Sequence, residues 1–418
     1  MNVKKYILII LTGAFLFTPH TAQSKAAWTG MVSFNFDDGH KSVYENALPV
    51  FKKYQIVGSI FPVVGAIEDQ EDWIVTWPQL SEFQAAGWEV GSHTMTHPHL
   101  TTLSAAQVDY ELGESQRILA EHGIIAKTLV FPYNSYNSLV LDYTTRYYEN
   151  SRTVGEFNGF DCNRYLIVCK EVSAATTPEE AIAWIQEAVQ KKMWLVLMMH
   201  EIVTGPPAGY QYNVADLEKI VTYVAAHNIP APNMQEALAR RQADLGPNLI
   251  ANPNLEYLDP FGWAIAWSRN NASQVSVEPA PVARVFSSGN RLKIVGSPQK
   301  NIASTNIIEL PDYKPRFFFS FFAAVTNAGQ DAEAEIYLDE FDANGQWLGG
   351  QWLGGFYEDT WGLPGYLYQP SSHQVRKIMI DIYTIPGANI TIWGDNFYFG
   401  FIKRRKHLPA IVNILLTN

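Results

Sequence analysis

The chain has 418 residues, a length that predicts two domains rather than one. Hydrophobic residues make up 47% of the sequence and charged residues only 17%, so a large core can form. The net charge of -11 excludes the basic footprint of a nucleic-acid-binding protein, and we expect no nucleic-acid partner.

Residues 1–26 have the pattern of a secretory signal peptide. Lys4 and Lys5 precede an apolar stretch over residues 6–17, and Ser24-Lys25-Ala26 offers small residues for cleavage. The stretch is shorter than the ~20 residues of a membrane-spanning helix, which makes an uncleaved anchor the weaker alternative. We therefore expect no stable membrane span after cleavage, and a protein that is secreted or periplasmic and associated with the cell envelope.

Residues 27–246 alternate between apolar, strand-like runs and helix-like stretches. The predicted strands cover residues 31–36, 56–64, 88–90, 128–131 and 194–199. The predicted helices cover residues 44–54, 77–86, 105–122, 178–191 and 214–227. This alternation predicts a parallel α/β domain, and a barrel fits it better than an open sheet. In such barrels the functional groups lie at the carboxyl ends of the strands.

The first polar cluster is Phe36-Asp37-Asp38-Gly39, at the end of the first predicted strand. Two adjacent ionised carboxylates repel each other, and a nearby cation would relieve that repulsion. Taken alone, the cluster fits a plain Asp-Asp-Gly turn better than a metal site.

The second cluster contains His93 and His97, which follow the strand predicted over residues 88–90. A spacing of four places both imidazoles on one face of a helical turn, and Pro98 ends that turn. Two histidines and one aspartate make a three-ligand set with an open position for water, as catalytic zinc sites have. His99 is a weaker ligand candidate because it would point away from the shared face.

The third cluster is Phe131-Pro132-Tyr133-Asn134, after the strand predicted over residues 128–131. The proline stiffens the turn, and the backbone N–H of Tyr133 could then point at a developing oxyanion. A turn without any catalytic role fits the same residues.

The only two cysteines, Cys162 and Cys169, lie seven positions apart. In an exported protein this pair predicts one disulfide that closes a small loop. Two buried free thiols are the alternative.

His200 ends the apolar strand predicted over residues 194–199. A histidine at this end of a strand, beside a metal site, would serve as a general acid. A buried histidine that bonds to the backbone is the alternative.

After Gly246-Pro247 the helical periodicity fades. Short apolar runs broken by Gly, Pro, Asn and Asp predict an antiparallel β-sandwich over residues 247–401. Trp347, Trp352 and Trp361 lie in a glycine-rich stretch, where exposed rings could stack on sugars or pack inside the sandwich. The basic and apolar tail, residues 402–418, is predicted to be a frayed end, with a weak membrane-surface contact as the alternative.

The clusters of the first domain resemble the motifs of the polysaccharide deacetylases of the NodB-homology type, carbohydrate esterase family four. The family's first motif matches Phe36-Asp37-Asp38-Gly39, its second matches His93-Thr94-Met95-Thr96-His97, and its apolar run ending in histidine matches residues 195–200. The resemblance covers residues 28–245 and implies a distorted (β/α) barrel.

The same resemblance implies the roles of the site residues. Asp37 would be the base, His200 the acid and Tyr133 the donor to the oxyanion, with Pro132 beside the substrate. The metal ligands would be Asp38, His93 and His97.

Three features depart from the family pattern. Val130 occupies the position of an arginine that orients the base, and Asn134 replaces the usual glycine. The fourth motif, Asp followed by Trp, is not evident, and Asp161 and Arg164 are its nearest candidates.

The second domain also carries a resemblance. Residues 248–256, Gly262-Trp263 and residues 392–397 are similar to the first and last strands of jelly-roll carbohydrate-binding modules.

These resemblances imply a hydrolase with a polysaccharide as its partner and one divalent metal ion as its cofactor. We expect zinc in a histidine-rich site with nitrogen and oxygen donors, with manganese or cobalt as alternatives. The implied reaction removes N-acetyl groups from an N-acetylhexosamine polysaccharide of the chitin, peptidoglycan or poly-N-acetylglucosamine type. An O-acetyl esterase of the acetylxylan type and a carbohydrate-binding protein with a decayed catalytic domain are the alternatives.

Overall fold

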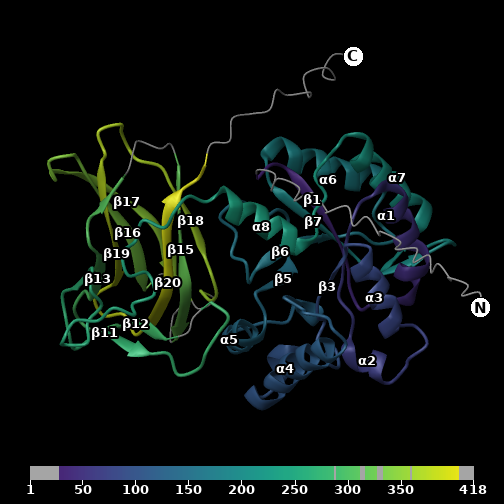
Figure 1. Cartoon of the computed structure of the whole chain (residues 1–418), viewed down its shortest axis with the longest axis horizontal. Helices are drawn as coiled ribbons and strands as arrows, with labels where there is room; N and C mark the ends of the chain where they lie inside the picture. Colours follow the sequence, from purple (N-terminus) through teal and green to yellow (C-terminus); the bar gives the residue numbers. More distant parts are fainter. Residues whose placement is uncertain (1–27, 287–288, 311–315, 327–332, 358–359, 404–418) are drawn as a thin grey trace, which may run out of the picture.

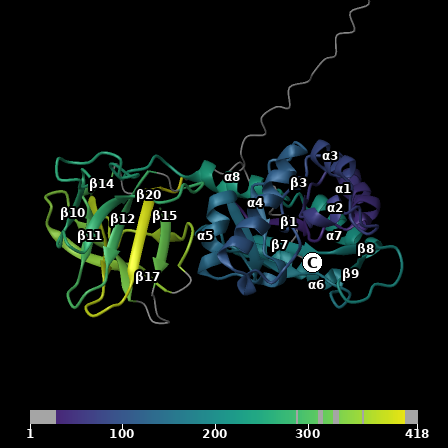
Figure 2. The same cartoon turned by 90° about the horizontal axis from the view of Figure 1, so that it is seen from below.

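The computed structural model describes residues 28–286, 289–310, 316–326, 333–357 and 360–403. An α/β domain and a β-sandwich lie end to end along the long axis of the molecule (Figures 1 and 2). The predicted signal peptide and residues 404–418 of the tail lie outside the described residues. Within the described ranges, no helix has the length and apolarity needed to cross a membrane.

Seven parallel strands form the sheet of the α/β domain, in the order β3-β2-β1-β7-β6-β5-β4. Their bounds are β1 (Met31–Phe36), β2 (Ser59–Ile60), β3 (Glu89–Val90), β4 (Thr128–Val130), β5 (Asn150–Val154), β6 (Ile167–Glu171) and β7 (Trp194–Met199). A parallel bridge between Ser92 and Leu129 joins the two edges, and Ser92 N–H donates to the Thr128 carbonyl at 2.9 Å. The sheet thereby closes on itself, which confirms the predicted distorted barrel.

Helices surround this barrel. They are η1 (Val43–Ala47), α1 (Leu48–Tyr54), α2 (Val64–Glu68), α3 (Trp77–Ala85), η2 (Leu100–Thr102), α4 (Ala105–Glu121), η3 (Pro132–Asn134), α5 (Ser138–Tyr147), α6 (Pro178–Lys191), α7 (Val214–Ala226) and α8 (Met234–Asp244). A short parallel pair, β8 (Glu201–Val203) and β9 (Gln211–Asn213), follows β7. Helix α6 has the predicted bounds because Thr177 accepts a hydrogen bond from Glu180 N at 3.1 Å and Pro178 occupies the first turn.

Alternate residues of β1 and β7 face the inside of the barrel, where they pack against α8. This interior cluster includes Met31, Trp194, Val196, Met198, Met234, Ala237 and Leu238. The intervening residues of β1, such as Phe34, pack against the surrounding helices instead. Because side chains alternate along a strand, the inward series continues to Asp37 after β1 and to His200 after β7.

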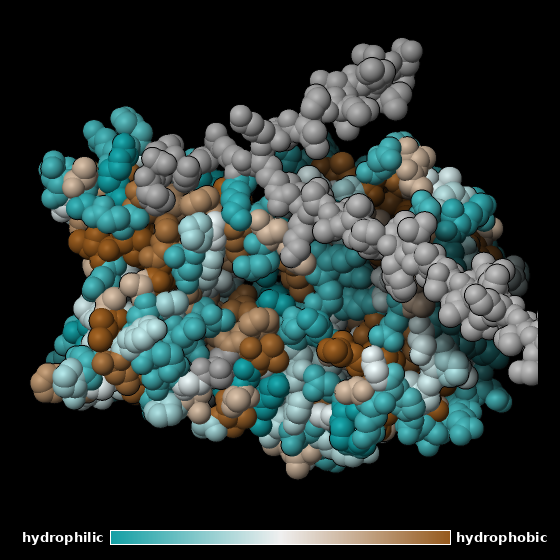
Figure 3. Space-filling model, in the orientation of Figure 1, coloured by the Kyte–Doolittle hydropathy of each residue, from teal (hydrophilic) through white to brown (hydrophobic). Residues whose placement is uncertain are grey.

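Two antiparallel sheets form the sandwich, in the orders β10-β13-β19-β16-β17 and β11-β12-β20-β15-β18, with β14 beside β19. Their bounds are β10 (Trp267–Arg269), β11 (Val275–Pro279), β12 (Asn290–Val295), β13 (Ile302–Thr305), β14 (Ile308–Glu309), β15 (Phe317–Thr326), β16 (Ala334–Phe341), β17 (Trp347–Phe356), β18 (Gly365–Tyr368), β19 (Lys377–Thr384) and β20 (Thr391–Phe401). Buried and half-buried residues alternate along β16 and β19, so one face of this sheet lies in the core and the other faces outward. The predicted β-sandwich is confirmed. On the face shown in Figure 3, hydrophobic residues lie in separate patches among hydrophilic ones.

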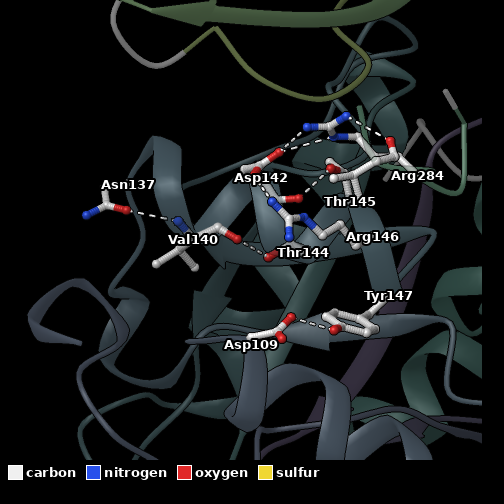
Figure 4. A network of polar contacts seen from close by, with 10 residues as sticks. Asp109, Asn137, Val140, Asp142, Thr144, Thr145, Arg146, Tyr147 and Arg284 are labelled. Atoms are coloured by element: carbon white, nitrogen blue, oxygen red, sulfur yellow. Dashed lines mark hydrogen bonds and ion pairs between the residues drawn. The ribbon is translucent and has the colours of Figure 1, made fainter. Parts of the chain in front are cut away.

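The two domains contact each other through Arg284, which lies between β11 and β12. Its Nε donates to Asp142 Oδ1 of α5 at 3.1 Å, and Asp142 also pairs with Arg146 one helical turn further on (Figure 4). Beside the linker, Gly246 N–H donates to the Phe401 carbonyl at 2.8 Å. These contacts fix the sandwich against the α/β domain.

Trp361 belongs to the same domain contact, and its predicted place on an exposed sugar-binding surface is wrong. Its side chain is buried, with 7% exposed, and its carbonyl accepts a hydrogen bond from Asn163 Nδ2 at 2.7 Å. The loop that carries Trp361 packs against the turn before β6, so the indole contributes to packing.

The predicted disulfide between Cys162 and Cys169 is wrong, because both thiols are free. Cys169 points into the barrel from β6, where its sulfur accepts a hydrogen bond from Arg152. Cys162 precedes β6, and its sulfur lies 3.4 Å from Nη1 of Arg241 on α8. Each sulfur therefore faces a different guanidinium. Burial raises the pKa of Cys169 to about 11, so it is a neutral thiol at pH 7.

Candidate metal centre and active site

Three strand ends bring the predicted polar residues to one mouth of the barrel. Asp37 follows β1, His93 follows β3 and His200 follows β7. Asp37 N–H donates to the Met199 carbonyl at 2.9 Å, which ties the ends of β1 and β7 together. A cleft of about 920 Å³ opens here, and its lining includes Asp37, Asp38, His93, His97 and His200.

Asp38, His93 and His97 form a compact triangle of donor atoms. Asp38 Oδ1 lies 3.4 Å from Nε2 of each histidine, and the two Nε2 atoms are 3.1 Å apart. A tetrahedral zinc site with bonds of about 2.0–2.1 Å has edges of about 3.3 Å. The three donors therefore fit three corners of such a site and leave the fourth corner for water or substrate.

The backbone fixes the tautomer of His93. Its Nδ1 lies 2.9 Å from the Val130 carbonyl, an acceptor that requires a proton on this nitrogen. The lone pair then lies on Nε2, the atom that faces Asp38 and His97. The side chain is 3% exposed, so the ring has little freedom to turn away.

Burial and charge keep the other two donors in the states that a cation needs. Burial alone would raise the pKa of Asp38, but the facing imidazoles of His40 and His93 hold that pKa well below its usual range. Burial, together with the adjacent His93 ring, lowers the pKa of His97 to about 4. At neutral pH, Asp38 is therefore a carboxylate and His97 offers a lone pair.

Glu111 of α4 holds the loop that carries both histidines. Its carboxylate accepts hydrogen bonds from the backbone N–H groups of Met95 at 3.0 Å and Thr96 at 2.8 Å, and from the Thr96 hydroxyl at 2.6 Å. The loop needs this support because Thr94 and His97 have left-handed φ angles of 70° and 59°. Such a conformation costs a non-glycine residue about 1–3 kcal/mol. Sequence reasoning missed Glu111, although an acidic residue within the apolar stripe of its helix could have marked it.

Asp37 is paired with an arginine, but this arginine does not come from the family's usual position. Arg152 donates to Asp37 Oδ2, and the two side chains are only 1% and 6% exposed. Val130, which replaces the family's arginine, is the register partner of Arg152 between β4 and β5. The guanidinium that is absent at position 130 is thus supplied by the neighbouring strand.

The second oxygen of Asp37 remains available. Asp37 Oδ1 is buried and has no hydrogen-bond partner among the described residues, while the residue itself lines the cleft. One oxygen is therefore held by Arg152 and the other is free to accept a proton.

His200 lines the same cleft beside Tyr210, with 5.0 Å between the ring centroids. Its Nδ1 is buried and has no hydrogen-bond partner within the described part of the chain. Asp161 and Arg164, the candidates for the fourth motif, do not line the cleft, and Arg164 lies 3.7 Å from Glu149 instead.

The turn after β4 brings Tyr133 and Asn134 to the cleft, with left-handed φ angles of 55° and 54°. The Tyr133 ring lies 4.6 Å from that of His97, and its other neighbour, His99, stacks on it at 4.0 Å. His99 is not part of the donor triangle. Pro132 is buried and does not itself line the cleft, so any effect it has on a substrate passes through the shape of this turn.

On the sandwich, Trp347 and Trp352 lie on the edge strand β17 and are 59% and 54% exposed. Trp347 Nε1 donates to Asp339 Oδ1 of β16 at 2.8 Å. Between the two tryptophans, Gly350 leaves room for the Tyr337 ring, because a Cβ at this position would lie 2.2 Å from it. The two indoles therefore flank an outward face that is partly aromatic.

Comparison with known proteins agrees with this geometry. The sequence model of the family described as "Polysaccharide deacetylase" matches residues 25–148. Residues 25–148 therefore carry the sequence pattern of this family. The matched segment, which gives the α/β domain its name of deacetylase domain below, includes Asp37, Asp38, His93, His97 and Tyr133, whereas Arg152 and His200 lie beyond it.

The deacetylase domain is similar to several curated proteins. It is 29% identical over 120 residues to the putative polysaccharide deacetylase YxkH of Bacillus subtilis (strain 168), a match that covers 28% of this chain and 42% of that protein. It is also 29% identical over 119 residues to the poly-beta-1,6-N-acetyl-D-glucosamine N-deacetylase of Staphylococcus aureus (strain MRSA252), with 25% and 41% covered. The chain thus spans less than half the length of these curated relatives. Among solved structures, the family 4 carbohydrate esterase from Streptomyces lividans in complex with acetate aligns with a TM-score of 0.37 and 21% identity, covering 49% of this chain and 93% of that one.

Proposed function

We propose that the deacetylase domain is a metal-dependent hydrolase that removes N-acetyl groups from a polysaccharide containing N-acetylhexosamine. The observation that carries this proposal is the donor triangle of Asp38, His93 and His97 beside the free oxygen of Asp37. A divalent ion held by the triangle would supply a water of lowered pKa and a Lewis acid for the acetyl carbonyl. The mixed nitrogen and oxygen donors suit zinc, with manganese or cobalt as alternatives.

The protein residues supply the rest of the chemistry. Asp37 takes a proton from the attacking water through its free Oδ1, while Arg152 holds the other oxygen. The backbone N–H of Tyr133 donates to the oxyanion that forms on the acetyl group. His200 then protonates the departing nitrogen, because an unprotonated amine leaves poorly. Acetate and a free amino sugar are the products.

We also propose that the sandwich binds the same polysaccharide through Trp347 and Trp352. Exposed indoles provide flat apolar surface with a polar edge, which suits the faces of sugar rings. A binding domain fixed to a catalytic domain raises the local concentration of substrate on an insoluble polymer. Together with the signal-like residues 1–26, this favours action outside the cytoplasm, secreted or at the cell envelope.

Acetate release from a panel of glycans tests the proposed activity. The panel contains chitin oligomers, poly-N-acetylglucosamine, peptidoglycan and acetylated xylan, with the full chain loaded with zinc. We expect release from an N-acetylated glycan, and we expect Asp37→Asn to keep its metal while kcat falls by roughly 10²–10⁴. Release from acetylated xylan alone would indicate an O-acetyl esterase. No release from any glycan by metal-loaded protein would indicate a carbohydrate-binding protein, and an active Asp37→Asn protein would refute the role of the base.

A further inference from the structure

The cleft above the metal centre is strongly acidic. Carboxylates are the only charged side chains, apart from histidine, in its lining, which contains no described lysine or arginine. The lining carboxylates are Asp37, Asp38, Asp69, Glu71, Glu171 and Glu201. Asp37 and Asp38 belong to the proposed catalytic centre, whereas the other four have no part in the proposed chemistry.

The cleft keeps a net negative charge when the centre holds a divalent ion. A divalent ion and the guanidinium of Arg152 bring three positive charges against the two of Asp37 and Asp38, so the centre itself carries one net positive charge. The four rim carboxylates then leave the cleft with three net negative charges, with histidines counted as neutral. None of the four forms an ion pair with a lysine or arginine in the described ranges.

Two rim carboxylates are already engaged by neutral donors. Glu71 accepts a hydrogen bond from the Trp73 indole, and Glu201 accepts one from Gln211 Nε2 at 2.8 Å. Asp69 and Glu171 are exposed and form no side-chain hydrogen bond to the described residues. Asp69 follows α2 on the β2 side of β1, and Glu171 ends β6 on the opposite side, so these two carboxylates lie on either side of Asp37 in the sheet order.

Exposed aromatic rings accompany the carboxylates around the centre. Trp73 lies 5.1 Å from the His40 ring, and Tyr210 lies 5.0 Å from the His200 ring. Both are exposed, Trp73 by 38% and Tyr210 by 64%. Flat rings next to carboxylates suit sugar rings that carry a positive charge, since the ring face packs on the aromatic surface and the cation pairs with the acid.

We propose that the cleft prefers a polysaccharide in which sugars next to the reacting unit already carry free amines. This rests on the proposed function, whose product is such an amine. Aliphatic amines take up a proton near or above neutral pH, and an acidic cleft favours the charged form further. Asp69 and Glu171 are positioned to pair with an ammonium on either side of the reacting sugar. Each deacetylation therefore improves binding for the next, and chains that carry carboxylates are repelled.

Calorimetric binding of two oligomers that are not substrates tests the charge preference directly. The first is a glucosamine tetramer, and the second is a glucose tetramer with the same linkage and hydroxyls in place of the amines. With zinc-loaded full chain at low salt, we expect the glucosamine tetramer to bind about five- to tenfold more tightly, the amount that two exposed ion pairs can supply. The difference should shrink in 0.5 M salt, because salt screens exposed charges.

Substitutions test whether the carboxylates of the cleft cause the preference for the glucosamine tetramer. The double variant Asp69→Asn/Glu171→Gln should bring the ratio of the two affinities close to one. Glu156→Gln is the matched control, because Glu156 is an exposed acid that does not line the cleft, and it should leave the ratio at the wild-type value. Equal affinity of the wild type for both tetramers, or an unchanged ratio in the double variant, would overturn the proposal. Acetate release reports separately on the proposed function, because neither tetramer carries an acetyl group.

Discussion

The mouth of the barrel and the outer face of β17 differ in how far their functional side chains are buried and held in place by neighbours. At the mouth, His93 is 3% exposed and its ring is fixed by the Val130 carbonyl. On β17, Trp347 and Trp352 are more than half exposed, and the fixed contact of Trp347 is one hydrogen bond to Asp339. The side chains at the mouth are held in fixed positions, as the proposed chemistry requires, whereas the face of β17 offers exposed area for the proposed binding of a polysaccharide. We therefore expect substitutions at the mouth to cause large losses of metal binding or activity, and substitutions on β17 to cause small losses of polysaccharide binding.

Removal of a metal ligand should produce the largest effect. In His93→Ala, the triangle loses one of its three donors, so we expect zinc affinity to fall by at least about 100-fold and acetate release to disappear. Metal content after dialysis measures this. His99→Ala is the matched control, because His99 stacks on Tyr133 outside the triangle and its loss should leave zinc bound. Stoichiometric zinc in His93→Ala would remove His93 from the ligand set.

Substitution of Arg152 should have the second largest effect, and it should lower both the stability and the activity of the protein. In Arg152→Met, Asp37 stays buried without its partner, which costs about 3–5 kcal/mol of the free energy of unfolding. Urea denaturation of the metal-free protein measures this cost. The double variant Asp37→Asn/Arg152→Met should recover most of the stability but no activity, because it removes the unpaired charge and the base together. If Arg152→Met unfolds at the wild-type urea concentration, the buried pair does not have this role.

Sequence reasoning located the parts of the centre that depend on short spacing. Asp38 follows directly after β1, and His93 and His97 lie four residues apart in one loop. The strands β1 and β7 also have the predicted bounds, because continuous apolar runs are typical of strands buried on both faces.

Long-range pairing explains what sequence reasoning missed. Arg152 lies 115 positions from Asp37, and it reaches that carboxylate only because seven strands close into a barrel in one register. Its strand, β5, is short and polar in sequence, so no apolar run predicts it. The predicted disulfide was wrong for the same reason. The Cys169 side chain points into the barrel because of its place on the inward face of β6, and its distance from Cys162 in the chain does not determine this.

Weaker support for the histidine loop should give an intermediate effect. In Glu111→Gln, the side chain keeps its size but loses its negative charge. It also loses one of the two carboxylate oxygens that accept three hydrogen bonds from Met95 and Thr96. We expect zinc affinity to fall by about 10- to 100-fold, the usual cost of losing support behind a metal ligand. Competition with a chelator measures this affinity. Glu114→Gln is the control, because Glu114 lies on the same helix and pairs with Arg117 at the surface. An equal zinc affinity in both variants would limit Glu111 to a structural role.

The smallest effect should come from the face of β17, and it should depend on the physical state of the substrate. Trp347→Ala and Trp352→Ala each remove one exposed ring, a loss of about two- to tenfold in affinity at 0.5–1.5 kcal/mol per aromatic contact. We expect this loss in retention on an insoluble N-acetylated polymer, measured by pull-down. Release of acetate from a soluble oligomer should not change, because the cleft alone binds a short chain. Phe261→Ala is the control, since Phe261 is 89% exposed outside β17. If all three variants bind the polymer like the wild type, the aromatic face of β17 does not bind the polysaccharide.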